Sequence, residues 1–324
     1  MKKHIYIYSP SGAVRDKAAF KRGVARLQAL GHEVEIDTAA LASYLRFAGD
    51  DETRLAAIHR AAASGADVAL ISRGGYGLSR ILAGIEYKKV AKAIEQGMRF
   101  IGFSDFTAFQ SAVLARTGAI TWAGPALCEG FGVGGKPDSA DGHGSGEKRQ
   151  PDEIMEACFD DLLRGQGEGA GWRQHKVSGA VTATVSDASV ALRNAVLWGG
   201  NLSLLTSLLG TPYFPQIKRG ILFLEDVGEP PYRVERMLTQ LLHAGVLDSQ
   251  KAVVLGQFTE FKLVPHYRGY KLATVVEWLR QQIKAPIITN LPFGHVATKV
   301  LLPVGAKVDL LLEGRDAMLL WGHL

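Results

Sequence analysis

Strand-like and helix-like segments alternate over the first 125 residues of this 324-residue chain. Short apolar runs predict strands, and longer segments with apolar residues at helical spacing predict helices. The predicted strands are His4–Tyr8, His32–Asp37, Asp67–Ser72, Arg99–Phe103 and Ala119–Ala123. The predicted helices are Asp16–Leu30, Asp51–Ala63, Tyr87–Gln96 and Asp105–Ala115. This order predicts an α/β fold with a parallel sheet, in which active sites lie at the carboxyl ends of the strands.

The order of elements becomes mixed in the second half of the chain. The expected helices are Glu153–Leu163, a segment after Asn201, Tyr232–His243 and Lys271–Gln282. The expected strands are Gln174–Thr184, Ala191–Leu197, Gly220–Glu225, Ala252–Gly256 and Pro286–Thr289, followed by two closing strands at Val300–Pro303 and Lys307–Glu313. A second domain of strands and helices is therefore expected.

Between these parts, residues 129–152 contain many glycines, two prolines and mixed charge, with Phe131 as the only large apolar residue. This composition predicts a linker or flexible insertion. We therefore expect domains at 1–128 and 153–324, joined by 129–152. Three glycines of the segment match a dinucleotide-binding spacing, but no strand leads into them and no helix follows, so no such cofactor is expected.

The overall composition narrows the class of protein. The chain is 47% hydrophobic and 21% charged, with a formal net charge of +5 that is spread along the sequence, which is typical of a soluble globular protein. No apolar run approaches the roughly 18 residues of a membrane helix, and the first apolar run is too short for a signal peptide. We expect a cytoplasmic protein without a nucleic-acid or membrane partner.

Cysteine is used sparingly. Cys128 and Cys158 are the two cysteines of the chain, and no CxxC motif is present. Neither a disulfide framework nor a zinc site is indicated. We expect no metal and no cofactor.

Ser104 lies between the predicted strand Arg99–Phe103 and the predicted helix Asp105–Ala115, with Gly102 two residues before it. A side chain at such a turn projects from the carboxyl edge of the sheet, beside the free N–H groups of a helix N-terminus. This is the geometry of a nucleophile elbow. Serine is also a favoured N-cap of ordinary helices, and the turn alone does not decide between the two interpretations.

Two later segments carry groups that a nucleophilic serine requires. The apolar strand that starts at Gly220 ends in Glu225 and Asp226, and His295 follows a strand in a Pro- and Gly-containing turn. A serine needs a base within hydrogen-bond reach, and the base needs an orienting carboxylate. Either acid could instead cap the next helix, as could Glu229, and His266 remains a rival for His295.

The segment Ser72–Arg80 follows the third predicted strand and contains Gly74 and Gly75. Adjacent glycines let a backbone approach a ligand closely. In the same sheet as Ser104, the Gly75 N–H and the Asp105 N–H would form an oxyanion hole. A tight turn or a phosphate-binding loop is the alternative.

Five motifs occur in order along the chain, namely RGGYG, GFSDFT, WGGNLSLL, ILFLEDVGEPPYRVERML and LPFGH. The chain resembles the LD-carboxypeptidase family of serine peptidases in these motifs, with microcin-immunity peptidases as distant relatives. The resemblance implies Ser104 as nucleophile, Glu225 and His295 as its triad partners, and Gly75 with Asp105 as the oxyanion hole. It also implies a Rossmann-like N-terminal domain, a β-rich C-terminal domain and a cytoplasmic homodimer. The expected substrate is a muropeptide tetrapeptide, from which the enzyme removes the terminal D-alanine across an L,D bond.

The candidate substrate-binding residues are Gly74, Tyr76, Asn201 and Arg233. Arg233 is equally suited to a helix surface or a dimer contact, and Asn201 to the cap of its helix. Two other functions remain open from the residues themselves, namely another α/β serine hydrolase such as an esterase, and a non-enzymatic ligand-binding protein.

Overall fold

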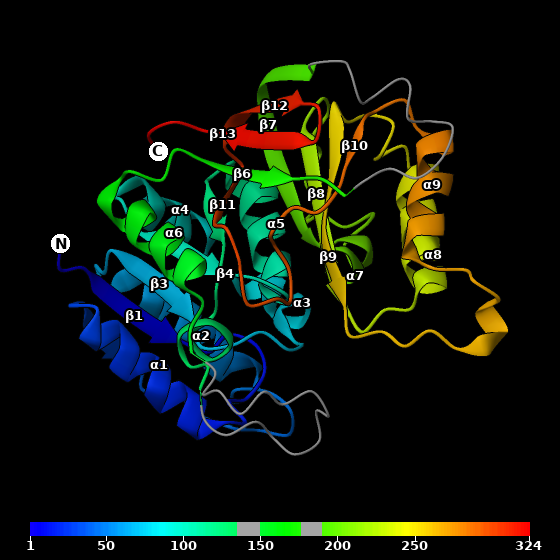
Figure 1. The fold of residues 1–324 in the computed structure, drawn as a ribbon. Helices are drawn as coiled ribbons and strands as arrows, with labels where there is room; N and C mark the ends of the chain where they lie inside the picture. The colour runs from blue at the N-terminus through cyan, green and yellow to red at the C-terminus, as the bar shows by residue number, and fades with distance from the viewer. Residues whose placement is uncertain (135–149, 176–189) are drawn as a thin grey trace.

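The computed structural model describes residues 1–134, 150–175 and 190–324. Its architecture consists of two sheets that lie side by side with helices packed against them (Figure 1). No helix in these three ranges is sufficiently long and apolar to cross a membrane. The expected α/β class, with a parallel N-terminal sheet and a second domain rich in strands, is confirmed.

The first sheet has six strands in the order β11-β5-β4-β3-β1-β2. Its strands are β1 (His4–Tyr8), β2 (Glu33–Ile36), β3 (Val68–Ile71), β4 (Arg99–Gly102), β5 (Thr121–Ala123) and β11 (Leu302–Val304). Strands β1 to β5 pair in parallel, whereas β11 pairs antiparallel with β5. The carboxyl ends of β3 and β4 therefore meet at one edge, where Gly74 and Ser104 follow.

Helices cover both faces of the first sheet because alternate residues of its strands point to opposite sides. These helices are α1 (Lys17–Ala29), α2 (Asp51–Ala63), α3 (Leu78–Ile81), α4 (Tyr87–Glu95), α5 (Phe106–Thr117) and α6 (Glu153–Arg164). One apolar cluster joins Ile5, Ile7 and Leu70 to the buried residues of α1 and α6, and the other joins Tyr6, Tyr8 and Ile71 to those of α2, α4 and α5.

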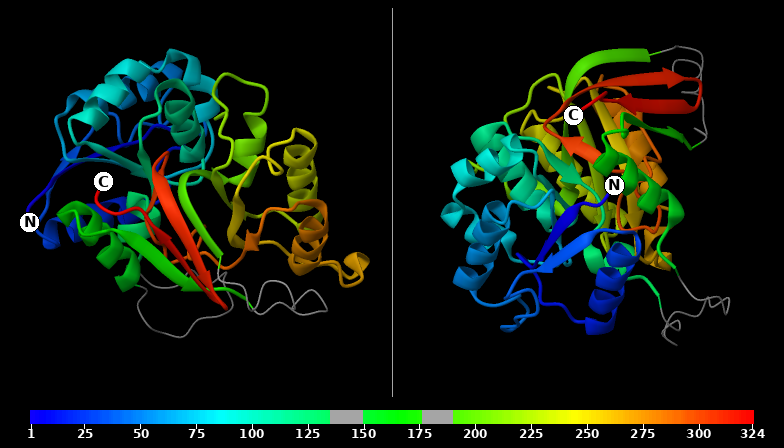
Figure 2. Two further views of the ribbon diagram at one scale, coloured as in Figure 1. Left: turned by 90° about the horizontal axis from the view of Figure 1, so that it is seen from above. Right: turned by 90° about the vertical axis from the view of Figure 1, so that its left-hand side faces the viewer.

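The second sheet has seven strands in the order β10-β9-β8-β7-β12-β13-β6. Its strands are β6 (Gly169–Arg173), β7 (Val190–Asn201), β8 (Ile221–Val227), β9 (Ala252–Thr259), β10 (Ile287–Ile288), β12 (Lys307–Glu313) and β13 (Asp316–Leu320). Strands β7 to β10 are parallel, and β12, β13 and β6 add antiparallel pairings. Helix α7 (Leu202–Ser207) follows β7 directly, and α8 (Pro231–His243) and α9 (Leu272–Gln282) cover the face turned away from the first sheet (Figure 2).

Helix α5 joins the two sheets. Its residues from Phe106 to Leu114 are all buried, and it packs against β7 and α7 as well as against α3 and α4. A helix that is buried all round belongs to the core of a protein rather than to its surface. The helix that follows the turn at Ser104 is therefore fixed by contacts with elements of both sheets.

Several sequence expectations differ from the structure. The chain closes with three strands, since β13 follows β12, and neither α3 nor the π-helical turn η2 (Leu127–Phe131) was predicted. The strand expected at Gln174–Thr184 lies mostly outside the described residues, and β6 ends before it at Arg173.

The expected linker can be compared with the structure only at its ends, because residues 135–149 lie outside the described ranges. At its start, Phe131 is 1% exposed and its ring lies 4.9 Å from that of Phe159 in α6. Both α6 and β11 follow position 152 in the chain but pack with the first sheet.

Candidate active site

Ser104 stands at the turn between β4 and α5 with a φ of 61°. A positive φ is unfavourable for a residue with a side chain and is typical of strained functional sites. The N-cap position of α5 is occupied by Asp105, and no side chain caps that helix. The N-cap interpretation of Ser104 is therefore wrong, because Ser104 occupies the strained turn before the cap. Only glycine fits at position 102 beside the Ile71 side chain, since a Cβ there would lie 2.7 Å from it.

The glycine loop after β3 lies directly against this serine. A Cβ on Gly74 would stand 3.0 Å from the Ser104 Cβ and 3.1 Å from its Oγ, so only glycine allows this approach. The Gly74 carbonyl accepts a hydrogen bond from the Gly12 N–H over 3.2 Å. Because the peptide is trans, the Gly75 N–H points the opposite way. Among the described residues, neither this N–H nor that of Asp105 has an acceptor, as an oxyanion hole requires.

The carboxylate of Asp105 connects the turn at Ser104 to the segment after β3 by a hydrogen bond, and the sequence did not predict this contact. It is fully buried and accepts hydrogen bonds from the Ser11 hydroxyl and, over 3.0 Å, from the Leu78 N–H. Burial raises the pKa of Asp105, and these hydrogen bonds oppose that shift. The side chain therefore ties the serine turn to the segment that carries Gly75.

We expect Asp105→Ala to lower the free energy of unfolding by about 1–3 kcal/mol, because it leaves the buried Ser11 and Leu78 donors without an acceptor. Asp105→Asn keeps one oxygen for these donors and should cost much less. Both variants keep the backbone N–H of residue 105. Urea unfolding of the two variants measures the difference, and equal loss in both would contradict a role as hydrogen-bond acceptor.

Glu225 and His295 form a hydrogen-bonded pair. Glu225 lies near the end of β8 and is fully buried, and its Oε2 lies 2.8 Å from Nδ1 of His295. The side chain of His295 is 19% exposed. Burial lowers the pKa of His295, but the hydrogen bond and charge of Glu225 more than offset it, so the pKa is raised above its ordinary value. A carboxylate in this position favours the tautomer with the proton on Nδ1.

The neighbouring Asp226 has different hydrogen-bond partners from Glu225. Its Oδ2 accepts hydrogen bonds from the N–H and hydroxyl of Ser203, and its Oδ1 accepts one from Nδ2 of Asn201 over 2.9 Å. It thus stabilises the start of α7. Neither acid caps α8, whose N-cap is Pro230.

Asn201 is 3% exposed and caps α7 by accepting from the Leu204 N–H. Its Nδ2 also donates to Glu225 Oε1 over 3.2 Å. Its backbone N–H donates to Oγ1 of Thr107 in α5 over 2.9 Å. Asn201 therefore holds the acid and links the end of β7 to the helix that follows Ser104.

His295 packs against Phe103, the residue next to Ser104. The ring centroids of His295 and Phe103 lie 4.9 Å apart, and Phe103 directly precedes the serine. Among the described residues, Ser104 makes no side-chain hydrogen bond to His295. In free enzymes such a bond often forms only when substrate is present.

The other candidate residues are placed as follows. Tyr76 is 43% exposed and lies under the guanidinium of Arg46. Arg233 is half exposed and paired with Glu229 over 2.7 Å. His266 lies exposed in the short helix Pro265–Tyr267, and in the described part of the chain it pairs with no carboxylate. The rival histidine therefore lacks the orienting partner that His295 has.

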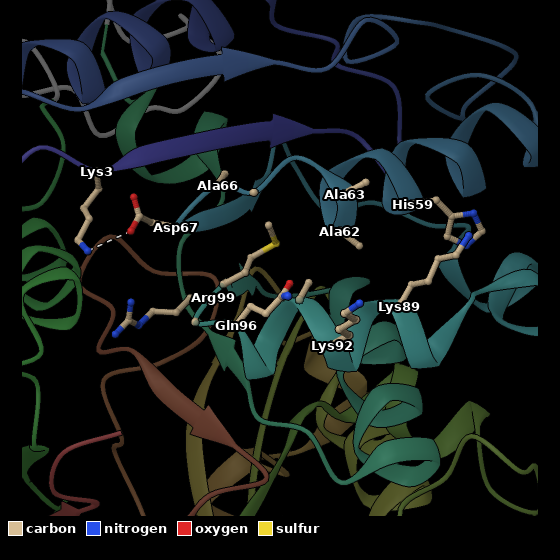
Figure 3. Close-up of a pocket in the computed structure, with 14 residues that line it drawn as sticks. Lys3, His59, Ala62, Ala63, Ala66, Asp67, Lys89, Lys92, Gln96 and Arg99 are labelled. Carbon is tan, nitrogen blue, oxygen red and sulfur yellow. Dashed lines mark hydrogen bonds and ion pairs between the residues drawn. The ribbon is translucent and has the colours of Figure 1, made fainter.

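A basic cavity of about 620 Å³ lies at the opposite edge of the first sheet (Figure 3). Its wall includes Lys3, which is paired with Asp67 over 3.0 Å, and Lys92 in the last turn of α4. Arg99 begins β4 at this edge, whereas Ser104 follows the other end of that strand. The cavity is thus separate from the candidate active site. In the three described ranges, no cluster of His, Cys, Asp or Glu could hold a metal.

Comparison with known proteins agrees with the motifs. Residues 5–124 match the LD-carboxypeptidase N-terminal domain, and residues 194–310 match the LD-carboxypeptidase C-terminal domain. The chain belongs to the LD-carboxypeptidase family. The resemblance drawn from the five motifs is thereby confirmed, and the enzyme is a serine-type LD-carboxypeptidase by family.

Individual relatives of this LD-carboxypeptidase cover most of its length. The murein tetrapeptide carboxypeptidase of Pseudomonas aeruginosa is 32% identical over 88% of this chain and 83% of its own. The crystal structure of muramoyltetrapeptide carboxypeptidase from Oxalobacter formigenes superposes with a TM-score of 0.81 at 35% identity over 98% of each chain. The microcin C7 self-immunity protein MccF of Escherichia coli is 26% identical over 75% of this chain and 70% of its own.

Proposed function

We propose that this LD-carboxypeptidase removes the terminal D-alanine from muropeptide tetrapeptides during peptidoglycan recycling, with Ser104, His295 and Glu225 as catalytic triad. The observation that carries the proposal is the Glu225–His295 hydrogen bond of 2.8 Å beside the strained turn at Ser104. The names of the Pseudomonas and Oxalobacter relatives support the substrate.

The proposed reaction proceeds through an acyl-enzyme. His295 takes the hydroxyl proton of Ser104, whose oxygen attacks the carbonyl that precedes D-alanine, and the N–H groups of Gly75 and Asp105 hold the oxyanion. The protonated His295 then gives its proton to the leaving amine as the C–N bond breaks. A water molecule, activated by His295, attacks the ester and releases the shortened peptide and free Ser104.

The remaining candidates are proposed to contact the substrate or the triad. We propose that Gly74 and Tyr76, which flank Gly75, line the path of the peptide, and that Arg233 is available for a substrate carboxylate. Asn201 would act through the acid that it holds. We also propose that the enzyme is a cytoplasmic homodimer, which gel filtration and cell fractionation would test.

Stereochemistry provides the sharpest test of the proposed substrate. We expect release of D-alanine from the tetrapeptide, no cleavage of the pentapeptide that ends in D-Ala-D-Ala, and poor cleavage of a tetrapeptide that ends in L-alanine. A misplacement of about 1 Å relative to the oxyanion donors can cost 10²-fold in rate, so the difference should appear in kcat/KM. Released amino acid is measured by mass spectrometry under matched conditions.

The other outcomes of this assay separate the alternative functions. Equal turnover of all three peptides would leave a serine hydrolase but contradict the proposed specificity. Hydrolysis of an aminoacyl nucleotide analogue without D-alanine release would favour a peptidase of the MccF type, since solved structures of MccF contain glutamyl sulfamoyl guanosine or aspartyl sulfamoyl adenosine.

A further inference from the structure

Lys299 is a buried lysine that the mechanism above does not use, and it is 2% exposed. It lies four residues after His295, in the loop between β10 and β11. Lysine is almost never fully buried unless it is paired. Within the described residues, however, the Lys299 ammonium forms no ion pair, and its hydrogen bond goes to the Val296 carbonyl. A buried ammonium without a carboxylate partner is unusual, and the groups around it indicate its role.

The ammonium contacts the residue that joins the serine to the histidine. Nζ of Lys299 lies 5.0 Å from the ring centroid of Phe103, within the range of a cation–π contact. The same ring lies 4.9 Å from the ring of His295. Phe103 is 3% exposed and immediately precedes Ser104. Lys299 and His295 thus both contact the ring of Phe103, next to the serine turn.

The loop that carries His295 and Lys299 is fixed at its end. Thr298 Oγ1 donates to Oδ2 of Asp152 over 2.7 Å, and Asp152 itself caps α6 through the Met155 N–H. Val300, directly after Lys299, is buried and its N–H bonds to the Pro292 carbonyl. The lysine is therefore not free to swing out into solvent.

The charges around His295 come from three places. Glu225 and Asp226 lie on β8, Glu129 lies on η2, and Lys299 lies on the histidine's own loop. The acids favour the protonated ring, and Lys299 is the group that opposes them. Burial lowers the pKa of Lys299, and Glu129, Glu225 and Asp152 act against that shift.

We propose that Lys299 is a positioning residue of the site: its buried ammonium holds Phe103 against His295, and its charge opposes protonation of His295 in the free enzyme. This inference rests on the proposed function. The same charge would destabilise the imidazolium that forms after attack by Ser104, and would thereby promote proton transfer to the leaving amine.

The test compares Lys299→Met, which removes the charge but keeps an unbranched apolar side chain, with Lys299→Arg, which keeps the charge. In Lys299→Met we expect the acidic limb of kcat/KM to move to higher pH by about one pH unit, as expected when a nearby positive charge that disfavours the imidazolium is lost. Lys299→Arg should keep the limb near its wild-type position. Lys284→Met, at an exposed lysine, is the matched control.

A second measurement does not depend on the substrate. The ring signals of His295, assigned with His295→Ala, are titrated by NMR in the wild type, in Lys299→Met and in Lys299→Arg. We expect His295 to titrate at higher pH in Lys299→Met only. If no peptide is cleaved but the titration shifts, the proposed substrate fails and the role of Lys299 stands. An unchanged titration, or an equal loss of activity at every pH in both variants, would overturn the inference.

Discussion

Ser104→Ala and His295→Ala should each lower kcat by on the order of 10⁴–10⁶ while the protein stays folded. The alanine at 104 removes the attacking oxygen, and the alanine at 295 removes the group that takes its proton. Both side chains lie in loops rather than in the apolar core, so circular dichroism and the melting temperature should change little. D-Alanine release from the tetrapeptide, followed by a sensitive coupled assay, provides the rates.

The double variant separates a shared step from two independent ones. If serine and histidine act as a unit, removal of both should cost little more than removal of either one. The residual rate would then reflect binding and the N–H groups of Gly75 and Asp105. Losses that multiply in the double variant would contradict the proposed triad.

The parallel half of the fold was predictable from local pattern. Residues of β3 are buried on both faces, so the strand reads as an uninterrupted apolar run, and α2 spans Asp51–Ala63 as predicted. The return of β11 to pair with β5 could not be predicted, because the two strands are separated by nearly the whole second domain. Strand β13 was missed although its alternating burial is typical of a half-exposed strand.

The candidate site could be located from the sequence where side chains follow strands. Ser104 and Glu225 stand at or near the carboxyl ends of β4 and β8, where functional side chains of parallel strands are expected. The two strands belong to different sheets, so their meeting could not be read from the strand order. The residues alone do not separate Glu225 from Asp226, and the choice of Glu225 rests on the family resemblance. In the structure both are buried acids, and their hydrogen bonds differ. Lys299 has no local signal, since its burial depends on packing against Phe103 from another part of the chain.

Glu225→Gln should lower activity by about 10²–10⁴, and the contacts of this side chain explain why a change of one atom matters. Oε1 accepts from Asn201 Nδ2 and Oε2 accepts from His295. A glutamine has one oxygen and one NH₂ group. If the NH₂ group faces Asn201, two donors meet in a buried site. If it faces His295, Nδ1 must become an acceptor, and the proton moves to the nitrogen that has to accept one from Ser104.

Asp226→Asn is the matched control for this substitution, since it makes the same chemical change one residue later on β8. Asp226 bonds Ser203 and Asn201 rather than His295, so we expect a loss of stability of about 1–3 kcal/mol but a much smaller loss of kcat. Steady-state rates at matched folded fractions, together with urea unfolding, distinguish the two effects. If Asp226→Asn lost more activity than Glu225→Gln, the orienting role would have to move from Glu225 to Asp226.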